Sequence, residues 1–390
     1  MQDFTFNTTP SVRQIAGGSA RLGEILADMV SVPKGAAVLF VTDPGLMALG
    51  LADAALADLE SNGFAVTLFD RVEPDPKAST VQDATAIAND AGAACVVGFG
   101  GGSSMDVAKV VALCLGTDQP LDEMYGVGMA RGRRAPLVLV PTTAGTGSEV
   151  TPISILTTGT AEKKGISSPL ILPDIALLDC DLTLGLPPSV TAATGVDAMV
   201  HAIEAYTSKS ANNNVLSQTL ATKALDLLSA NIREAVFNGG NREARAAMLL
   251  GSLLAGQAFA NSPVAAVHAL AYPVGALFKV PHGLSNALVL AEVMRFNLPV
   301  AGRQYAELAP HIFPDIDTAR DSQAIAAELI ERLARLNGEL GLEPGLRSVG
   351  IGAGDIDRLA ADAMKQTRLL VNNPCELTEA DIRGIYQASL

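Results

Sequence analysis

The sequence is poor in charged side chains, and positive charge is scarcer still. Charged residues make up 17% of the 390-residue chain and hydrophobic residues 49%, so the chain can bury a large core and is not expected to be disordered. Lysine and arginine number 27 against 41 acidic residues, which gives a net charge of −14. A protein that binds by neutralising phosphates needs a concentrated excess of basic side chains. We therefore expect no nucleic-acid partner.

Cysteine is also scarce, and its spacing argues against a disulfide framework. The four cysteines are scattered without a C-x-x-C pair: Cys95, Cys114, Cys180 and Cys375. This pattern fits reduced thiols in a cytoplasmic protein. The N-terminal residues lack the basic region and the apolar run of a signal peptide. Both observations predict a cytoplasmic location.

One long stretch contains no charged residue at all. Residues 246–278 lack Asp, Glu, Lys and Arg, and a stretch of this length passes a simple hydropathy test for a membrane span. It also contains Gln257, Asn261 and two prolines, and its flanks show no Lys or Arg bias that would orient a span. A buried helix in a large helical domain is the preferred interpretation. No membrane partner is expected.

The first half of the chain alternates between strand and helix patterns. One helical pattern ends at about residue 61, and a second spans about residues 80–91. Short apolar runs before, between and after them predict four buried parallel strands, at residues 36–41, 64–69, 94–98 and 136–140. Such an alternation predicts right-handed crossovers and a sheet covered by helices on both faces.

The pattern changes after residues 186–188. From residue 190 onward the chain consists mostly of long helical patterns, and no segment gives a confident strand. The predicted fold is therefore a Rossmann-like α/β domain over residues 1–186, followed by an all-helical domain over residues 187–390.

A glycine-rich segment directly follows the third predicted strand. Residues 100–109 read GGGSSMDVAK and open a predicted helix. Consecutive glycines let the backbone approach a ligand closely, and the first turn of a helix attracts an anion such as a pyrophosphate. Taken alone, the same glycines would also serve a sharp corner with no ligand.

The acidic residue best suited to bind a ribose comes before these glycines. In the G-x-G-x-x-G fingerprint it follows them by about 20 residues, whereas here Asp43 ends the first predicted strand. A carboxylate at this position can accept hydrogen bonds from ribose hydroxyls and repel a 2′-phosphate, which favours NAD over NADP. Asp43 and Pro44 also suit the start of the next helix, and the two roles can coexist.

A second polar loop follows the fourth predicted strand. Residues 141–149 read PTTAGTGSE and lie at the carboxyl end of that strand, the edge where open α/β sheets bind ligands. A purely structural loop of this composition is possible. Two glycine- and hydroxyl-rich loops after parallel strands nevertheless favour a nucleotide site.

Histidine is rare, yet three of the four histidines fall in one part of the chain. Asp197 and His201 are four residues apart in a helical pattern, so both side chains lie on one helix face. His268 and His282 follow, while His311 stands apart in what we expect to be a loop or surface position. A lone histidine is more often a core residue than a ligand. One carboxylate and three imidazoles together suit Fe²⁺ or Zn²⁺ and leave room for a substrate oxygen.

These motifs together resemble those of the iron-containing, or group III, alcohol dehydrogenases. The resemblance runs from the first strands to the C-terminal region and is carried by residues 100–109, 141–152, 191–206 and 268–286. It implies a dehydroquinate synthase-like fold, with an α/β dinucleotide-binding domain and a helical metal-binding domain. It also implies hydride transfer between a small alcohol, or an aldehyde or ketone, and NAD(H), with the metal polarising the substrate oxygen. A homo-oligomer is expected from the resemblance alone.

The resemblance also assigns roles to individual residues. The metal ligands fall on Asp197, His201, His268 and His282. Lys163 matches a lysine near the nicotinamide ribose, with Lys164 as the alternative. The full set assigned to cofactor binding is Asp43, Gly100, Gly101, Gly102, Ser103, Asp106, Thr142, Thr143, Thr146, Ser148 and Lys163.

The chain departs from the family pattern at one position near the metal. Many members carry a further histidine four residues after the third ligand, and here that position is Tyr272. We count Tyr272 among the catalytic candidates because a phenol can donate a hydrogen bond or relay a proton. With an ordinary pKa near 10, it is a poorer base than histidine at neutral pH.

Three related activities remain as alternatives on the same scaffold. A maleylacetate reductase or a hydroxyacid–oxoacid transhydrogenase acts on carboxylated substrates and needs cationic side chains, which the sequence does not place. A dehydroquinate synthase-like lyase uses fewer metal ligands and clamps a phosphorylated substrate. The pairing of Asp197 with His201 argues against the lyase.

Overall fold

The computed structural model describes residues 3–159 and 162–390, and it divides into two compact units. The α/β unit comprises Asn7–Thr143 and Gly147–Leu184. The helical unit comprises Gly185–Leu390, the N-terminal segment up to Phe6 and the short segment Ala144–Thr146. The domain boundary at residue 186 stays a prediction.

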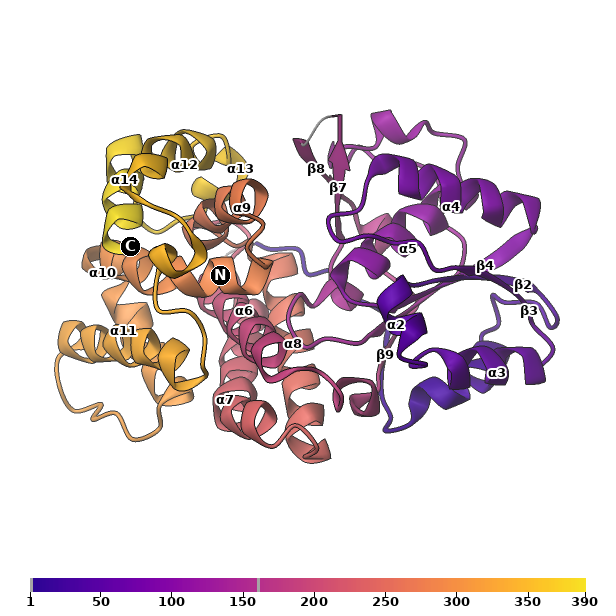
Figure 1. Ribbon diagram of the computed structural model, residues 1–390, viewed down its shortest axis with the longest axis horizontal. Helices are drawn as coiled ribbons and strands as arrows, with labels where there is room; N and C mark the ends of the chain where they lie inside the picture. The colour runs from indigo at the N-terminus through magenta and orange to yellow at the C-terminus, as the bar shows by residue number, and fades with distance from the viewer. Residues whose placement is uncertain (1–2, 160–161) are drawn as a thin grey trace. The chain divides into compact units, whose positions relative to one another are not determined.

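The α/β unit is built on one parallel sheet of six strands (Figure 1). Neighbouring strands in this sheet all run in the same direction. Their order across the sheet is β1 (Ser11–Gln14), β9 (Ile175–Leu178), β6 (Leu137–Pro141), β4 (Ala93–Gly100), β2 (Ala37–Val41) and β3 (Ala65–Phe69). The four predicted strands correspond to β2, β3, β4 and β6.

Apolar side chains cover both faces of this sheet. Leu39 and Val41 of β2 belong to one buried cluster, with α4 (Ala78–Asp90) and α5 (Gly102–Leu115). The alternate residues of the same strand, Val38 and Phe40, belong to a second cluster with α1 (Leu22–Ala27) and α3 (Asp53–Ser61). Figure 1 shows α4 and α5 on one side of the sheet and α3 on the other. A strand buried on both faces reads as a continuous apolar run, which explains why these strands were predictable.

The structure also contains elements that the sequence did not reveal. The predicted helix up to residue 61 is two helices, α2 (Pro44–Ala48) and α3, because Gly50 between them adopts a φ of 67°. A second, three-stranded sheet was not predicted either. In it, β8 (Glu162–Ser167) pairs with the antiparallel β7 (Ile153–Thr158) and the short parallel β5 (Gly126–Val127).

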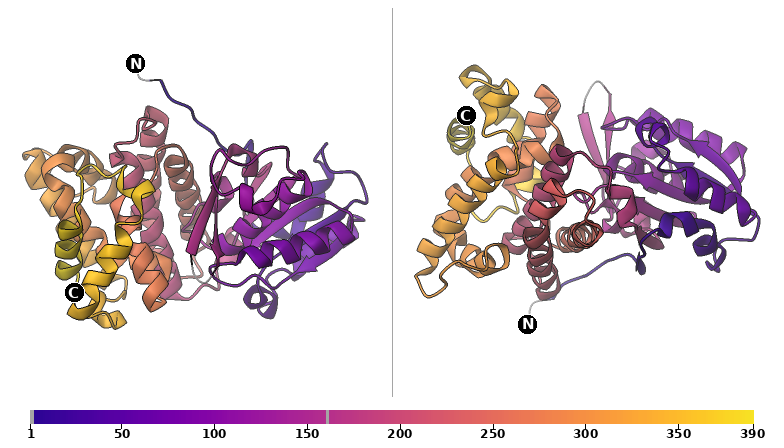
Figure 2. Two further views of the ribbon diagram at one scale, coloured as in Figure 1. Left: turned by 90° about the horizontal axis from the view of Figure 1, so that it is seen from above. Right: turned by 60° about the horizontal axis from the view of Figure 1, so that its bottom comes forward.

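The helical unit consists of packed helices, and its described residues contain no strand, as predicted. Helices α6, α7 and α8 pack on one another, and α10 packs on α6, α9 and α11 (Figure 2). The helices are α6 (Pro188–Thr207), α7 (Val215–Phe237), α8 (Arg242–Asn261), α9 (Ala266–Phe278), α10 (His282–Ile312), α11 (Ser322–Glu339), α12 (Ile356–Ala363), α13 (Thr367–Leu370) and α14 (Glu379–Ala388).

The uncharged stretch at residues 246–278 is divided between two of these helices. Most of α8 and all of α9 fall within it, and Ser262 ends the first. In the described part of the chain, no helix combines the length and the apolar character that a membrane span requires.

The expectation of a loop or surface position for His311 holds for the surface and not for the loop. His311 lies in the last turn of α10, its side chain is 36% exposed, and its Nδ1 lies 2.8 Å from Asp226 Oδ1. Pro310 is accommodated inside this long helix.

The close packing of α5 on the sheet depends on a glycine in the central strand β4. A methyl group at Gly98 would lie 2.6 Å from Leu139 Cδ2 and 2.7 Å from Ala108 Cβ. The missing side chain therefore lets α5 approach the sheet closely, and it fixes where the helix begins relative to the strand ends.

We expect Gly98→Ala to lower the free energy of unfolding by about 1–3 kcal/mol, because the added methyl group overpacks a dense core. The measurement is the midpoint of urea unfolding, followed by circular dichroism. Gly384→Ala is the matched control, since a methyl group there has nothing within 4 Å inside α14. Equal midpoints for the two variants would contradict this account of the packing.

Candidate metal centre and cofactor loops

Helix α6 carries one face of acidic and imidazole side chains. Asp197, His201 and Glu204 are spaced so that all three lie on the same side of the helix, and all three are buried. The surrounding residues of α6 are small or apolar, so these polar groups can be buried only with partners of their own.

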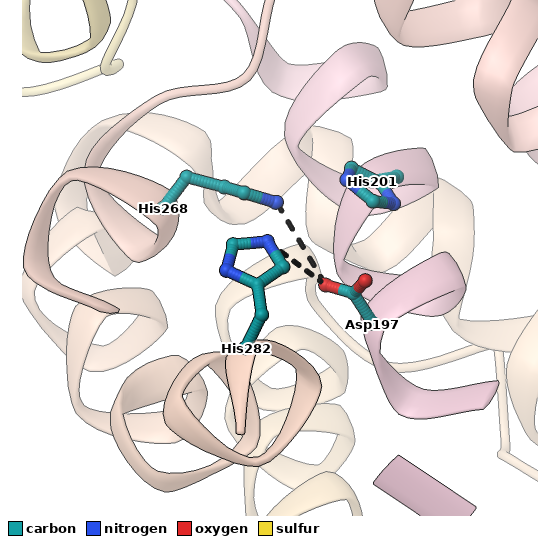
Figure 3. A group of neighbouring side chains, drawn as sticks. All are labelled: Asp197, His201, His268 and His282. Atoms are coloured by element: carbon teal, nitrogen blue, oxygen red, sulfur yellow. Dashed lines mark ion pairs between the residues drawn. The ribbon is translucent and has the colours of Figure 1, made fainter. Parts of the chain in front are cut away.

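Two further helices bring histidines to this face. His268 lies in the first turn of α9 and His282 is the first residue of α10. Asp197, His201, His268 and His282 each offer one ligand atom, and these atoms all lie within 4.8 Å of one another. Figure 3 shows the His268 and His282 rings directed at the Asp197 carboxylate, with His201 one helical turn away. The structure thus brings together the four residues predicted as metal ligands.

A glycine allows α10 to start this close to α6. A methyl group at Gly283 would lie 2.3 Å from the Ala193 carbonyl oxygen and 3.2 Å from Asp197 Cβ. Any side chain here would push the first turn of α10, and His282 with it, away from Asp197. Gly283 therefore determines how close His282 can lie to Asp197.

The four side chains differ in exposure. Asp197, His201 and His268 are buried, whereas the His282 side chain is 42% exposed. Tyr272, one turn after His268 on α9, has its ring centroid 5.8 Å from that of His282. Exposure within the cluster is therefore confined to His282, and Tyr272 lies beside this exposed ligand.

Burial and neighbouring charges set the protonation of the cluster. Burial lowers the pKa of His201 to about 3, against the opposing effect of Asp197. Burial acts to raise the pKa of Asp197, but the three imidazoles and the Asn286 amide outweigh it and hold this pKa below its ordinary value. At neutral pH the carboxylate is ionised and His201 is neutral, the forms in which both bind metals.

The orientation of His201 is fixed by two neighbours. Its Nδ1 lies 3.2 Å from the carbonyl oxygen of Gly145, which can only accept a hydrogen bond, so Nδ1 carries the proton. The ring of Phe259 stacks on the imidazole with 4.3 Å between the centroids. The unprotonated Nε2 is thereby left for an ion.

Asn286 is a buried neighbour of the cluster that the sequence reasoning missed. Its Nδ2 donates to Asp197 Oδ1 at 2.6 Å and lies 3.3 Å from Nε2 of both His268 and His282. Its own Oδ1 is buried without a hydrogen-bond partner among the described residues. An amide donor surrounded by three acceptors, with an unpaired oxygen of its own, marks a place suited to a cation. One carboxylate oxygen and three imidazole nitrogens fit Fe²⁺ or Zn²⁺.

In the α/β unit, the predicted cofactor loops lie at neighbouring strand ends. From β2 the chain continues to β3, which lies on one side of β2 in the sheet. The later strands β4 and β6 lie on the other side of β2, so the strand order reverses between β2 and β4. Ligands of open α/β sheets bind at such a switch point. Asp43 follows β2, Gly101 to Ser103 follow β4, and Thr142 and Thr143 follow β6.

The glycine loop has the backbone conformation expected for a close approach. Gly100 has a φ of 152°, and a methyl group there would lie 2.7 Å from Ser104 Oγ. Helix α5 begins at Gly102, so the free N–H groups of its first turn lie at the strand ends. Asp43 caps α2 by accepting hydrogen bonds from Gly45 N and Leu46 N on its Oδ1. The structural role foreseen for Asp43 is therefore present.

Other residues predicted to bind the cofactor are engaged with one another. Lys109 Nζ is buried and donates to Ser148 Oγ at 2.7 Å and to the Ile153 carbonyl oxygen at 2.8 Å. Ser148 Oγ donates in turn to Asp106 Oδ1 at 2.7 Å, and burial lowers the pKa of Lys109. This network ties the start of α5 to the second loop. Asp106 and Ser148 thus hold the two loops together, a role their sequence positions did not reveal.

The last two predicted cofactor residues belong to other parts of the structure. Thr146 belongs to the helical unit, in the segment Ala144–Thr146 that also supplies the Gly145 carbonyl. Lys163 lies on β8 of the second sheet, where its Nζ pairs with Asp75 Oδ1 at 2.6 Å. The alternative, Lys164, has its Nζ 6.0 Å from the ring centroid of Tyr125.

These features define a class, a metal-dependent oxidoreductase with a nucleotide-binding α/β unit and a helical metal-binding unit. The family model for iron-containing alcohol dehydrogenase matches residues 10–180, and that for the C-terminal part of the Fe-containing alcohol dehydrogenase family matches residues 191–390. The chain belongs to the iron-containing alcohol dehydrogenase family. The predicted family, fold class and alcohol dehydrogenase activity are confirmed.

Similar proteins cover nearly the whole chain. Long-chain-alcohol dehydrogenase 1 of Geobacillus thermodenitrificans is 39% identical over 355 residues, which cover 90% of this chain and 89% of the relative. A crystal structure of 1,3-propanediol oxidoreductase has a TM-score of 0.94 and 34% identity, with full coverage of both chains. Sulfoacetaldehyde reductase from Bifidobacterium kashiwanohense, solved with NAD⁺, has a TM-score of 0.87 and 28% identity, covering 100% of this chain and 99% of that one. The expectation that iron and NAD are the cofactors of this family is confirmed.

The second loop contains a buried acid whose ionisation weakens the fold. Burial raises the pKa of Glu149 to about 7 from an unperturbed value of 4.5, while Lys109 acts in the opposite direction. Because the folded form holds the proton more tightly, the contribution of Glu149 to stability is complete below pH 4.5 and is lost as the pH rises through 7.

We expect wild-type protein to lose on the order of 3 kcal/mol of unfolding free energy between pH 4.5 and 8 through this group, and Glu149→Gln to lack that loss. Urea unfolding of both proteins at several pH values tests this. Glu60→Gln, at an exposed position of α3, controls for the removal of a surface charge. Parallel stability profiles for wild type and Glu149→Gln would contradict the assignment.

Proposed function

We propose that this alcohol dehydrogenase holds an iron ion on Asp197, His201, His268 and His282 and oxidises a small alcohol, or reduces the matching aldehyde or ketone, with NAD(H). The observation that carries the proposal is the convergence of one carboxylate and three imidazoles from three helices within 4.8 Å. Zn²⁺ suits the same donors and binds more tightly than Fe²⁺ in general, so it is the alternative metal.

The residues of the chain supply position and charge, and the cofactors supply the reactive chemistry. When bound, the cation polarises the substrate oxygen and NAD accepts or donates the hydride. His282 and Tyr272 border the exposed side of the cluster, so the substrate oxygen enters beside them. We propose that the Tyr272 hydroxyl hydrogen-bonds the substrate or relays its proton. Burial of the other three ligands keeps water from the inner side of the ion.

In the α/β unit, the loops after β2, β4 and β6 are proposed to hold NAD. The first turn of α5 faces the diphosphate with its free N–H groups, with Gly100, Gly101, Gly102 and Ser103 around it. Asp43 accepts hydrogen bonds from the ribose, and the Thr142 and Thr143 loop contacts the cofactor. Asp106 and Ser148 act through the Lys109 network, which holds these loops in place.

The remaining parts of the proposal concern the setting of the enzyme. The domains are residues 1–186 and 187–390, the location is the cytoplasm, and the enzyme is a homo-oligomer. The four free cysteines support a reducing compartment. Thr146 and Lys163 are proposed as further contacts to the cofactor, on the strength of the family motif alone.

The metal centre is tested by removing one ligand. We expect His268→Ala to abolish alcohol oxidation and to lower the bound metal well below one ion per chain, because the cluster loses one of four donors. The chain is stripped of metal and reloaded anaerobically with Fe²⁺ or Zn²⁺. It is then assayed with NAD⁺ against short alcohols, diols and hydroxyacids, and metal content is measured by elemental analysis.

His311→Ala is the matched control, because this histidine pairs with Asp226 at the end of α10. It should retain both metal and activity. A His268→Ala protein with full metal and full activity would overturn the ligand assignment. Exchange between a hydroxyacid and an oxoacid without net consumption of NADH would instead indicate a transhydrogenase.

The role of Asp43 is tested by a substitution that keeps its cap. Asp43→Ser retains a side-chain acceptor for the N-terminus of α2 but removes the negative charge. We expect the ratio of kcat/KM for NAD⁺ over NADP⁺ to fall roughly tenfold or more, about 1.4 kcal/mol, with unchanged stability. An unchanged ratio would show that Asp43 serves only as a helix cap.

A further inference from the structure

The carboxylate of Glu204 lies directly behind one of the proposed metal ligands. Its Oε2 is 2.6 Å from His268 Nδ1, and its Oε1 accepts the Val267 backbone N–H at 2.7 Å. The side chains of Glu204 and His268 are both almost completely buried. The other ring nitrogen, His268 Nε2, faces the cluster and lies 3.8 Å from Asp197 Oδ1.

The same carboxylate also caps the N-terminus of helix α9. The N-cap residue of this helix, Ala265, provides no side-chain hydrogen bond. Val267 is in the first turn, where backbone N–H groups lack partners within the helix. Glu204 supplies the missing acceptor from α6, and its negative charge suits the N-terminal end of the α9 dipole. Glu204 of α6 therefore holds both the first turn of α9 and the imidazole ring of His268.

Only an acceptor with two oxygens satisfies both partners. The Val267 N–H can only donate, so it requires Oε1 as an acceptor. With Oε2 also an acceptor, His268 must present Nδ1–H to it, which leaves Nε2 free of a proton on the side of the cluster. A glutamine of the same shape offers one oxygen and one NH₂ group. It therefore either leaves the Val267 N–H unpaired or drives the ring to the form with a proton on Nε2.

We propose that Glu204 is a positioning residue that holds His268 with Nδ1 protonated and Nε2 directed at the ion. This inference rests on the metal centre proposed above. Hydrogen bonds of this kind orient ligating imidazoles and raise their basicity, and their loss costs 10- to 100-fold in metal affinity in other sites. Glu204 does not itself contact the ion, so its effect must pass through His268.

The test measures Zn²⁺ affinity of the full chain, without reference to activity. Metal-free wild type, Glu204→Gln, His268→Ala and the double variant are titrated with Zn²⁺ in competition with a chelating indicator. We expect Glu204→Gln to weaken binding about 10- to 100-fold in the wild-type background. In the His268→Ala background, the same substitution should change affinity by less than about twofold. Co²⁺ spectra of wild type and Glu204→Gln should also differ, since the geometry around the ion changes.

Ser262→Ala is the matched structural control. Ser262 Oγ donates to the Ala205 carbonyl oxygen at 2.6 Å, so the variant removes another buried hydrogen bond between α6 and the segment before α9. Its Zn²⁺ affinity should equal that of wild type. If it loses affinity as strongly as Glu204→Gln, the role of Glu204 is merely structural and the proposal fails.

The remaining outcomes separate the two proposals. Failure of the wild type to bind Zn²⁺ or Fe²⁺ at one ion per chain overturns the metal centre itself. Normal binding by wild type and by Glu204→Gln overturns only the role of Glu204, as does an equal effect of Glu204→Gln with and without His268. If Glu204→Gln does not fold, as judged by circular dichroism, Glu204→Asp is used. Its shorter carboxylate cannot reach both donors, so it must also lose affinity through His268.

Discussion

The helical unit is organised around the burial of one charged carboxylate. Asp197 is almost fully buried in α6, and an ionised carboxylate is stable there only if donors or cations replace the water it loses. The Asn286 amide of α10 donates a hydrogen bond to it, and an ion bound together with His201, His268 and His282 would supply the balancing positive charge. Gly283 brings α10 near enough for Asn286 and His282 to reach the carboxylate. The packing of α9 and α10 against α6 thus places partners around the buried Asp197 carboxylate.

The α/β unit meets a different constraint, the burial of a parallel sheet on both faces. Once helices cover both faces, the strand ends are the only part of the sheet where the backbone can meet a ligand. The loops there are held by buried polar contacts, with the fully buried Lys109 bonded to the second loop at Ser148 and to β7 at Ile153. A lysine ammonium in such a place is tolerated because Asp106 and several oxygens surround it. The loops are therefore fixed by the fold before any nucleotide arrives.

The sequence predicted best what is continuously apolar or chemically rare. Strands β2, β3, β4 and β6 are short apolar runs, and three of the four ligands stand out because histidine is scarce. Strand β9 is apolar but only four residues long, β1 is equally short and mostly polar, and β7 and β8 are rich in Thr, Lys and Ser. None of them has the longer apolar run by which the other strands were predicted. Glu204 and Asn286 could not be singled out, because glutamate and asparagine are common and their partners are set by helix contacts.

The helical unit contains a single cysteine, Cys375, so no disulfide can join its helices to one another. An ion held by Asp197, His201, His268 and His282 would take that part. It would tie α6, α9 and α10 at one point, and it would stabilise the folded form because the unfolded chain does not present the assembled site. Such a cross-link is reversible, and its strength depends on the free metal concentration in the cell. The supply of iron would then govern how firmly the helical unit is folded, as well as how fast the enzyme works.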